Sequence, residues 1–125
     1  MAVIVDTSVL IDLLGGTRYL ILDRALAEGT LVLPPLVIAE VLSGETTPSE
    51  REILGDLLQD YSLHATPLAH WFDLGALRRT LRTKGLNVTL PDAHVAQCAL
   101  DLDATLLTRD DIFLHIARHT PLRLG

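Results

Sequence analysis

The sequence predicts an α/β fold with a central, mostly parallel sheet. Short runs of β-branched and other apolar residues alternate with longer segments whose apolar residues recur at helical spacing. Strands that alternate with helices pair in parallel, because each helix carries the chain back to the starting edge of the sheet. The chain has 125 residues, of which 49% are hydrophobic, and this is enough for one domain with a core of its own.

The first half of the chain predicts two strands and four helices. The apolar run before Asp6 predicts a strand, and Asp6 or Thr7 can cap the helix that follows. Gly15 and Gly29 come directly after predicted helices, where glycine readily ends a helix. Prolines open the next two helices, since the first helical turn does not need the amide hydrogen that proline lacks. The expected strands are 2–6 and 30–33, and the expected helices are 7–14, 18–28, 35–43 and 46–61.

The second half continues the alternation of strands and helices. A long amphipathic helix is expected over 67–85. We find no internal repeat, low-complexity tract or linker, so residues 1–125 are expected to form a single domain. The remaining expected elements are strands at 62–65, 104–110 and 121–124 and helices at 90–101 and 111–119.

Composition restricts the location and the partners of the protein. No apolar run reaches the ~18 residues that span a membrane. No lysine or arginine precedes Arg18, so the basic segment that begins a signal peptide is missing. We therefore expect a cytoplasmic protein with no membrane association. The formal net charge is −6, so binding of nucleic acid would require metal ions or a local basic patch.

Four acidic residues are candidates for a common site. Asp6 and Asp110 follow predicted strands, and sites in open parallel sheets form beyond the carboxyl ends of strands. Glu40 lies in an almost wholly apolar helical turn, and Asp92 begins a helix. Each acid also has a structural interpretation. Glu40 could be an exposed helical residue, the three aspartates could cap helices, and Asp111 competes with Asp110 for either role.

Taken together, the four acids indicate a particular chemistry more clearly than any one of them does alone. Four neighbouring carboxylates would repel and raise one another's pKa, and a divalent cation removes that repulsion. Mg²⁺ or Mn²⁺ prefers carboxylate oxygens and water. Two such ions can activate a water and stabilise the leaving oxygen of a phosphodiester.

Four motifs carry a family resemblance. "VDTSVLIDLL", "LPPLVIAEVL", "LPDAHVAQCAL" and "ATLLTRDDIF" occur in this order along nearly the whole chain. They resemble the motifs of the PIN-domain ribonucleases and, more narrowly, of VapC toxins from toxin–antitoxin pairs. The resemblance implies a three-layer α/β/α sandwich. It also implies RNA as substrate, Mg²⁺ or Mn²⁺ as cofactor, a homodimer, and a VapB-type antitoxin that blocks the pocket.

The resemblance also assigns roles to individual residues. It implies that the catalytic acids are Asp6, Glu40, Asp92 and Asp110, with Asp6, Asp92 and Asp110 as metal ligands. The supporting residues are Thr7, Ser8 and Thr108, which supply hydroxyls, and Asp111. Asp111 departs from the family pattern, because the acid often found directly before the phenylalanine of the last motif is replaced by Ile112.

Several other residues allow two interpretations. Arg78, Arg79 and Arg82 form either a solvated helix face or a track for RNA phosphates. Arg109 could contact a substrate phosphate or pair with an acid. Trp71 is expected in the core or at a dimer interface, and the apolar stripe on helices 7–14 and 18–28 is expected to bind a partner.

The histidines and the cysteine give weaker indications. His115 and His119 have a zinc-like spacing but no further ligands nearby, and His64, His70 and His94 show no pattern in the sequence. Cys98, the only cysteine, lies in an apolar helical stretch and is expected to be a buried thiol.

Two other functions compete with a nuclease. A receiver-like or phosphoryl-transfer protein is disfavoured, because Lys84 is the only lysine and stands near a helix end, and because no Asp-x-Asp follows the first strand. The second is a catalytically idle PIN-like module that binds RNA or a partner, and the sequence does not exclude it.

Overall fold

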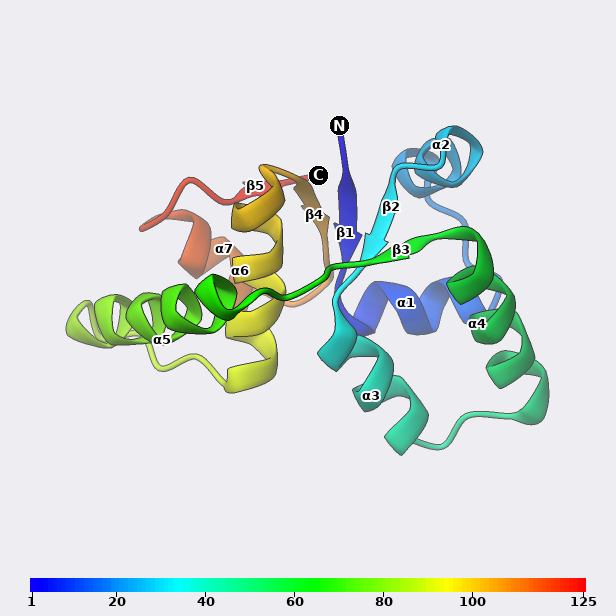
Figure 1. Ribbon diagram of the computed structural model, residues 1–125, viewed down its shortest axis with the longest axis horizontal. Helices are drawn as coiled ribbons and strands as arrows, with labels where there is room; N and C mark the ends of the chain where they lie inside the picture. The colour runs from blue at the N-terminus through cyan, green and yellow to red at the C-terminus, as the bar shows by residue number, and fades with distance from the viewer.

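The computed structural model describes residues 1–125 and contains a five-stranded sheet surrounded by seven helices (Figure 1). The strand order is β3-β2-β1-β4-β5, and every neighbouring pair is parallel. This confirms the predicted α/β class. The strands are β1 (Val3–Val5), β2 (Leu31–Leu33), β3 (Ser62–Leu63), β4 (Thr105–Leu107) and β5 (Arg123–Leu124).

The helices follow the predicted ranges, with shifts at their ends that have local causes. The fourth helix begins at Pro48, because Thr47 caps it and exchanges hydrogen bonds with Glu50 in a capping box. The second helix ends at Gly29, whose φ of 70° is the left-handed conformation that favours glycine. The helices are α1 (Thr7–Leu14), α2 (Leu20–Glu28), α3 (Pro35–Ser43), α4 (Pro48–Asp60), α5 (Leu68–Thr83), α6 (Leu90–Leu102) and α7 (Ile112–Ala117).

The connections between strands place the helices in two layers. Parallel strands are joined almost always by right-handed crossovers. The chain moves from β1 to β2 to β3 through α1–α4 and then returns past β1 to β4 and β5 through α5–α7, so the two helix groups cover opposite faces. Figure 1 shows α5–α7 gathered near β4 and β5, and α1–α4 near β2 and β3. The predicted three-layer α/β/α arrangement is therefore confirmed.

The core lies on both faces of the central strands. All three residues of β1 are buried, and Leu106 of β4 is fully buried beside Ile4 in the register of the two strands. Strands covered on both faces read as continuous apolar runs, which is why the sequence showed no alternation here. Cys98 of α6 is also buried, as predicted, and burial raises the pKa of its thiol.

The fold has one buried polar network that the sequence did not indicate. His70 lies between His94 and Asp101, with His70 Nε2 2.8 Å from His94 Nδ1 and His70 Nδ1 2.5 Å from Asp101 Oδ2. His64 Nε2 also contacts Asp101 Oδ2, at 2.7 Å. The interpretation that these three histidines form no pattern was wrong, because β3, α5 and α6 bring them together from distant positions in the chain.

Hydrogen-bond partners define the protonation state of this network. The amide of Leu36 donates to His94 Nε2 at 3.4 Å, so the proton of neutral His94 lies on Nδ1 and points to His70. His70 then carries its proton on Nδ1 and donates it to Asp101. Burial opposes the charge of Asp101, but hydrogen bonds from His64, Gln97 and His70 outweigh burial and lower the pKa of this carboxyl. The network therefore places three imidazoles around one carboxylate.

None of the seven helices combines the length and the apolar character that crossing a bilayer requires. The two edge strands, β3 and β5, are two residues long each.

We predict that the protein loses stability in mild acid through His94. Burial lowers the pKa of His94 from 6.5 to about 4, and the nearby His70 and His64 act in the same direction. The unfolded chain therefore binds this proton at a higher pH than the folded protein does. The stabilisation is present above about pH 6.5, and on the order of 3 kcal/mol of it is lost as the pH falls to 4.

Urea unfolding between pH 7 and pH 4 measures this loss. His94→Gln should be less stable at pH 7 but should decline less steeply with acid. The control is His119→Gln, since His119 is exposed and should leave the wild-type decline unchanged. Parallel pH profiles for wild type and His94→Gln would contradict the assignment.

Candidate metal centre

The four candidate acids line one cavity beyond the carboxyl ends of the central strands. β1 and β4 are neighbours in the sheet. The connection after β1 runs to β2 on one side, and the connection after β4 runs to β5 on the other side, so a crevice opens between the ends of these two strands. The cavity has a volume of about 370 Å³. Its lining consists of Asp6, Thr7, Ser8, Ile11, Glu40, Asp92, Val95, Arg109 and Asp110.

Asp6 is the buried centre of this site, with an exposed fraction of 5%. Its Oδ1 accepts hydrogen bonds from Ser8 Oγ at 2.6 Å and from the Val9 amide at 3.0 Å, and its Oδ2 accepts one from Thr108 Oγ1 at 2.5 Å. The bond from Val9 caps α1, so the capping role and the site role of Asp6 coexist. Three donors thus satisfy the oxygens of this buried carboxylate and fix it in one orientation.

Thr108 connects the ends of the two central strands. Its hydroxyl donates to Asp6 and accepts a hydrogen bond from the Asp110 amide at 2.9 Å. Asp110 Oδ1 accepts a bond from the Ile112 amide at 3.1 Å, immediately before α7. After β4, the backbone amides of residues 110 and 112 bond to side chains instead of to a neighbouring strand. The strand therefore ends at Leu107 rather than at the predicted residue 110.

Glu40 and Asp92 come to the cavity from helices on opposite sides of the sheet. Glu40 is exposed to solvent. It is held at the cavity by a hydrogen bond that its Oε1 accepts from Thr7 Oγ1 at 2.8 Å. Asp92 lies in the first turn of α6, where its amide donates to the cap residue Thr89.

The pKa of Asp92 is raised in this cavity. Burial is the main cause that raises the pKa of Asp92, and a hydrogen bond from Thr89 acts in the opposite direction. The carboxylates of Asp110, Glu40 and Asp6 raise the pKa further by repulsion.

Arg109 is the one basic residue in the cavity lining, and its charge is already paired. The Arg109 guanidinium lies 2.7 Å from Asp12 Oδ2, measured from Nε, and Asp12 also accepts a hydrogen bond from Tyr19. The Arg109 amide donates to Ser8 Oγ at 3.2 Å. Sequence reasoning missed Asp12 and Tyr19, because the contact of Asp12 with Arg109 joins residues 97 positions apart.

The other candidates lie outside the cavity lining. Asp111 lines a neighbouring hollow that it shares with Asp110. Arg78 donates from Nε to the carbonyl of Val88 at 2.9 Å, and Arg79 and Arg82 are exposed on α5.

The donor set fits a hard divalent cation. All four acids offer carboxylate oxygens, and the only cation among the lining residues, Arg109, is paired with Asp12. Burial, followed by repulsion from Asp110, Glu40 and Asp6, raises the pKa of Asp92 in this cavity. Asp6, Asp92 and Asp110 could hold Mg²⁺ or Mn²⁺, whose preferred ligands are carboxylates and water.

Comparison with known proteins identifies the family. The model of the PIN domain family matches residues 3–119. The chain belongs to the PIN domain family. The family assignment made from the sequence motifs is thereby confirmed.

Solved structures share the complete fold of this PIN domain. VapBC2 from Rickettsia felis, bound to a DNA fragment from its promoter, matches with a TM-score of 0.81 and 22% identity, covering 100% of this chain and 98% of that one. DNA-bound VapBC from Salmonella typhimurium matches with a TM-score of 0.83 and 16% identity, covering 100% and 97%. VapBC-5 from Mycobacterium tuberculosis matches with a TM-score of 0.70 and 22% identity, covering 99% and 98%.

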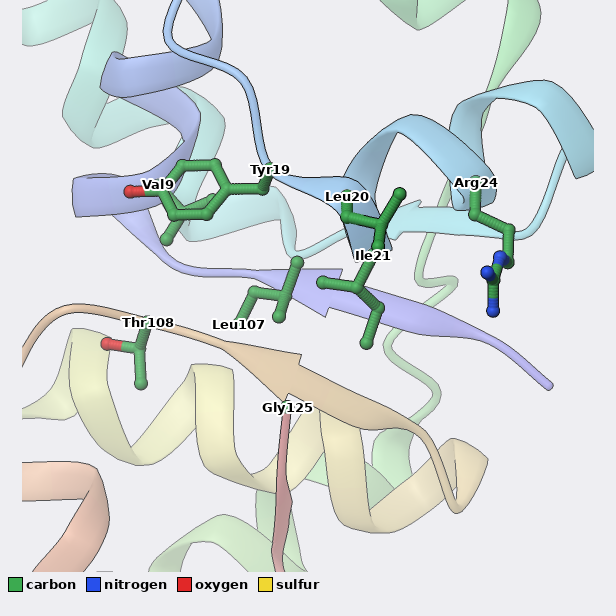
Figure 2. Close-up of a pocket in the computed structure, with 8 residues that line it drawn as sticks. All are labelled: Val9, Tyr19, Leu20, Ile21, Arg24, Leu107, Thr108 and Gly125. Atoms are coloured by element: carbon green, nitrogen blue, oxygen red, sulfur yellow. The ribbon is translucent and has the colours of Figure 1, made fainter.

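A second cavity, which is mainly apolar, adjoins the carboxylate cavity of this PIN domain. It has a volume of about 450 Å³, and Figure 2 shows it between α2, the end of β4 and the C-terminal residue. Thr108 lines this cavity, and its hydroxyl donates to Asp6, which lines the carboxylate cavity. The lining residues are Val9, Tyr19, Leu20, Ile21, Arg24, Leu107, Thr108 and Gly125.

We predict that Glu40→Gln stabilises the metal-free protein. The change removes one of the charges that raise the pKa of Asp92, while the amide oxygen can still accept the bond from Thr7. Because Glu40 is exposed, solvent screens the repulsion, and a gain of about 0.5 kcal/mol is expected at neutral pH.

Chemical denaturation in EDTA tests this prediction. The matched control is Glu52→Gln, which removes an exposed charge on α4, away from the cavity, and should change stability little. A loss of stability specific to Glu40→Gln would contradict the repulsion.

Proposed function

We propose that this PIN domain protein is a metal-dependent endoribonuclease that acts as the VapC-type toxin of a toxin–antitoxin pair. The observation that carries the proposal is that Asp6, Glu40, Asp92 and Asp110, from four separate parts of the chain, line one cavity at the carboxyl ends of the central strands. Such a concentration of negative charge costs stability unless it serves to hold cations. The fold shared with VapBC structures supports the toxin assignment.

In the proposed mechanism, each acid has a distinct environment. Asp6, Asp92 and Asp110 would hold Mg²⁺ or Mn²⁺, and the ion would supply activation of a water and charge stabilisation at the leaving oxygen of a phosphodiester. Ser8 and Thr108 keep both oxygens of Asp6 in place. Glu40, positioned by Thr7, supports the site. Asp92 would hold the ion from the first turn of α6, on the side of the cavity opposite Glu40.

RNA must approach a protein of net charge −6. In our proposal a divalent ion held by the acids would supply the positive charge that a substrate phosphate requires, and Arg109 lines the same cavity. Arg79 and Arg82 are exposed on α5 and supply more distant phosphate contacts, whereas Arg78 is held by the Val88 carbonyl. Asp111, in the hollow next to Asp110, supports the site from outside its lining.

The proposed partners are a second copy of the chain and a VapB-type antitoxin, in the cytoplasm. The apolar cavity lined by Thr108 is suited to an antitoxin segment, because its lining is mainly apolar and Thr108 contacts Asp6 of the carboxylate cavity. Another apolar surface consists of Leu68, Trp71 and Phe72 on α5, which are exposed by 72%, 42% and 71%. Exposed patches of this kind mark interfaces, and we assign this one to the homodimer.

We predict that the purified protein cleaves structured RNA in the presence of Mg²⁺ or Mn²⁺ and not in EDTA. Asp6→Asn should lower the rate by about 100-fold or more, because it removes a ligand charge at the centre of the site. The control is Asp56→Asn, which alters an exposed acid on α4 and should cleave like the wild type.

Mapping of the cleavage sites on total RNA measures both activity and specificity. Equal cleavage by Asp6→Asn and wild type would point to a contaminating nuclease. If no RNA is cleaved and calorimetry shows no binding of Mg²⁺, the nuclease proposal fails and an idle binding module remains.

We further predict that Phe72→Glu weakens the dimer at least tenfold, because it places a charge in the centre of an apolar interface. Light scattering during size-exclusion chromatography over a range of concentrations measures the effect. Leu114→Glu, at an exposed position on α7, is the matched control and should dimerise like the wild type. A dimer unaffected by Phe72→Glu would place the interface elsewhere.

A further inference from the structure

A second group of metal-ligating side chains lies away from the carboxylate cavity. His64 follows β3, His70 lies in the first turn of α5, and Cys98 and Asp101 are one turn apart on α6. None of these four residues lines the carboxylate cavity. Three segments of the chain therefore bring imidazole, thiol and carboxylate groups to one place.

The distances in this group are close to those of a tetrahedral metal site. One ligand atom each from His64, His70 and Cys98 lie within 4.8 Å of one another. Asp101 Oδ2 lies 2.7 Å from His64 Nε2 and 2.5 Å from His70 Nδ1. The ligand atoms of tetrahedral Zn²⁺ are roughly 3.3–3.8 Å apart, given metal–ligand bonds of about 2.0–2.3 Å. Shifts of about 1 Å, within the reach of side-chain rotation, would therefore open the space for an ion.

We propose that His64, His70, Cys98 and Asp101 form a second metal site that binds Zn²⁺ or a chemically similar transition metal and joins β3, α5 and α6. The ligand types separate this site from the carboxylate cavity, because nitrogen and sulfur ligands favour Zn²⁺ over Mg²⁺ or Mn²⁺. Its role is structural, since the four protein ligands would complete a tetrahedral coordination sphere.

The proton balance of binding follows from the hydrogen bonds already described. Zn²⁺ takes the place of the proton on His70 Nδ1 and of the proton on His64 Nε2, and the thiol of Cys98 releases its proton to solvent. Each imidazole stays neutral by carrying its proton on the other nitrogen, and His70 then donates from Nε2 to His94 at the observed 2.8 Å. A ligand histidine that donates its second N–H in this way is the usual arrangement around zinc.

Two weak interactions are lost in this rearrangement. The amides of Leu36 and Thr66 donate to His94 Nε2 and His64 Nδ1, each at 3.4 Å, and both acceptors would become protonated. These are long hydrogen bonds, so their loss costs little relative to metal–ligand bonds. An ion can enter beside Asp101, whose side chain is 17% exposed, whereas that of His70 is fully buried.

The single tryptophan provides a local probe for this site. The ring of Trp71 lies 4.9 Å from that of His70, measured between centroids. Co²⁺ bound by His70 should therefore quench the fluorescence of Trp71, and coordination by Cys98 should add thiolate-to-cobalt absorption in the near ultraviolet. The titration uses the whole protein with Mg²⁺ in large excess, so that the carboxylate cavity is occupied.

We expect wild type to bind one equivalent of Co²⁺ with both signals, and Zn²⁺ to displace it. Asp6→Asn should retain both signals, because the carboxylate cavity is not involved. Cys98→Ser should lose the thiolate absorption and bind at least tenfold more weakly, and His70→Gln should lose both signals.

Two results would overturn the proposal. One is the absence of thiolate absorption when wild type is titrated. The other is loss of both signals in Asp6→Asn, which would place the ion in the carboxylate cavity. Circular dichroism verifies that each variant is folded, and Cys98→Ser still decides the question if His70→Gln does not fold. Neither result depends on whether the protein cleaves RNA.

Discussion

The hydrogen bonds that hold Asp6 determine the geometry of this molecule. A buried carboxylate without partners would cost several kcal/mol, and Asp6 avoids this cost through donors from Ser8, Val9 and Thr108. Two of these donors belong to the start of α1, and the third follows β4. The carboxylate therefore joins the ends of the two central strands at the crevice where their connections diverge. Every other residue of the site is positioned relative to this junction.

The remaining acids add negative charge at this junction. Their mutual repulsion is confined to the carboxylate cavity, outside the hydrophobic core. The carboxylate cavity opens to solvent, where cations can reach it. The carboxylate of Asp101 is instead stabilised by hydrogen bonds with three side chains of the protein. The pKa values of the two acids on α6 thus shift in opposite directions. Burial and then repulsion raise the pKa of Asp92 at the start of the helix, and hydrogen bonding lowers that of Asp101 near its end.

The sequence predicted what depends on local pattern and on order along the chain. Strand ends placed Asp6 and Asp110 at one edge, and family motifs added Glu40 and Asp92, which the structure brings to the same cavity. The pairing of Asp12 with Arg109 was not predictable, because it depends on the exact neighbourhood of β1 and β4. The histidine network was missed for the same reason, since no periodicity connects residues 64, 70, 94 and 101.

The brevity of the outer strands has a consequence for assembly. β3 and β5 expose edges of only two residues, so they give an incoming strand too few backbone groups to extend the sheet. The folded protein is therefore poorly suited to association by strand addition. Side chains on the helices offer the larger surface for a partner, and there specificity can change by substitution without altering the backbone.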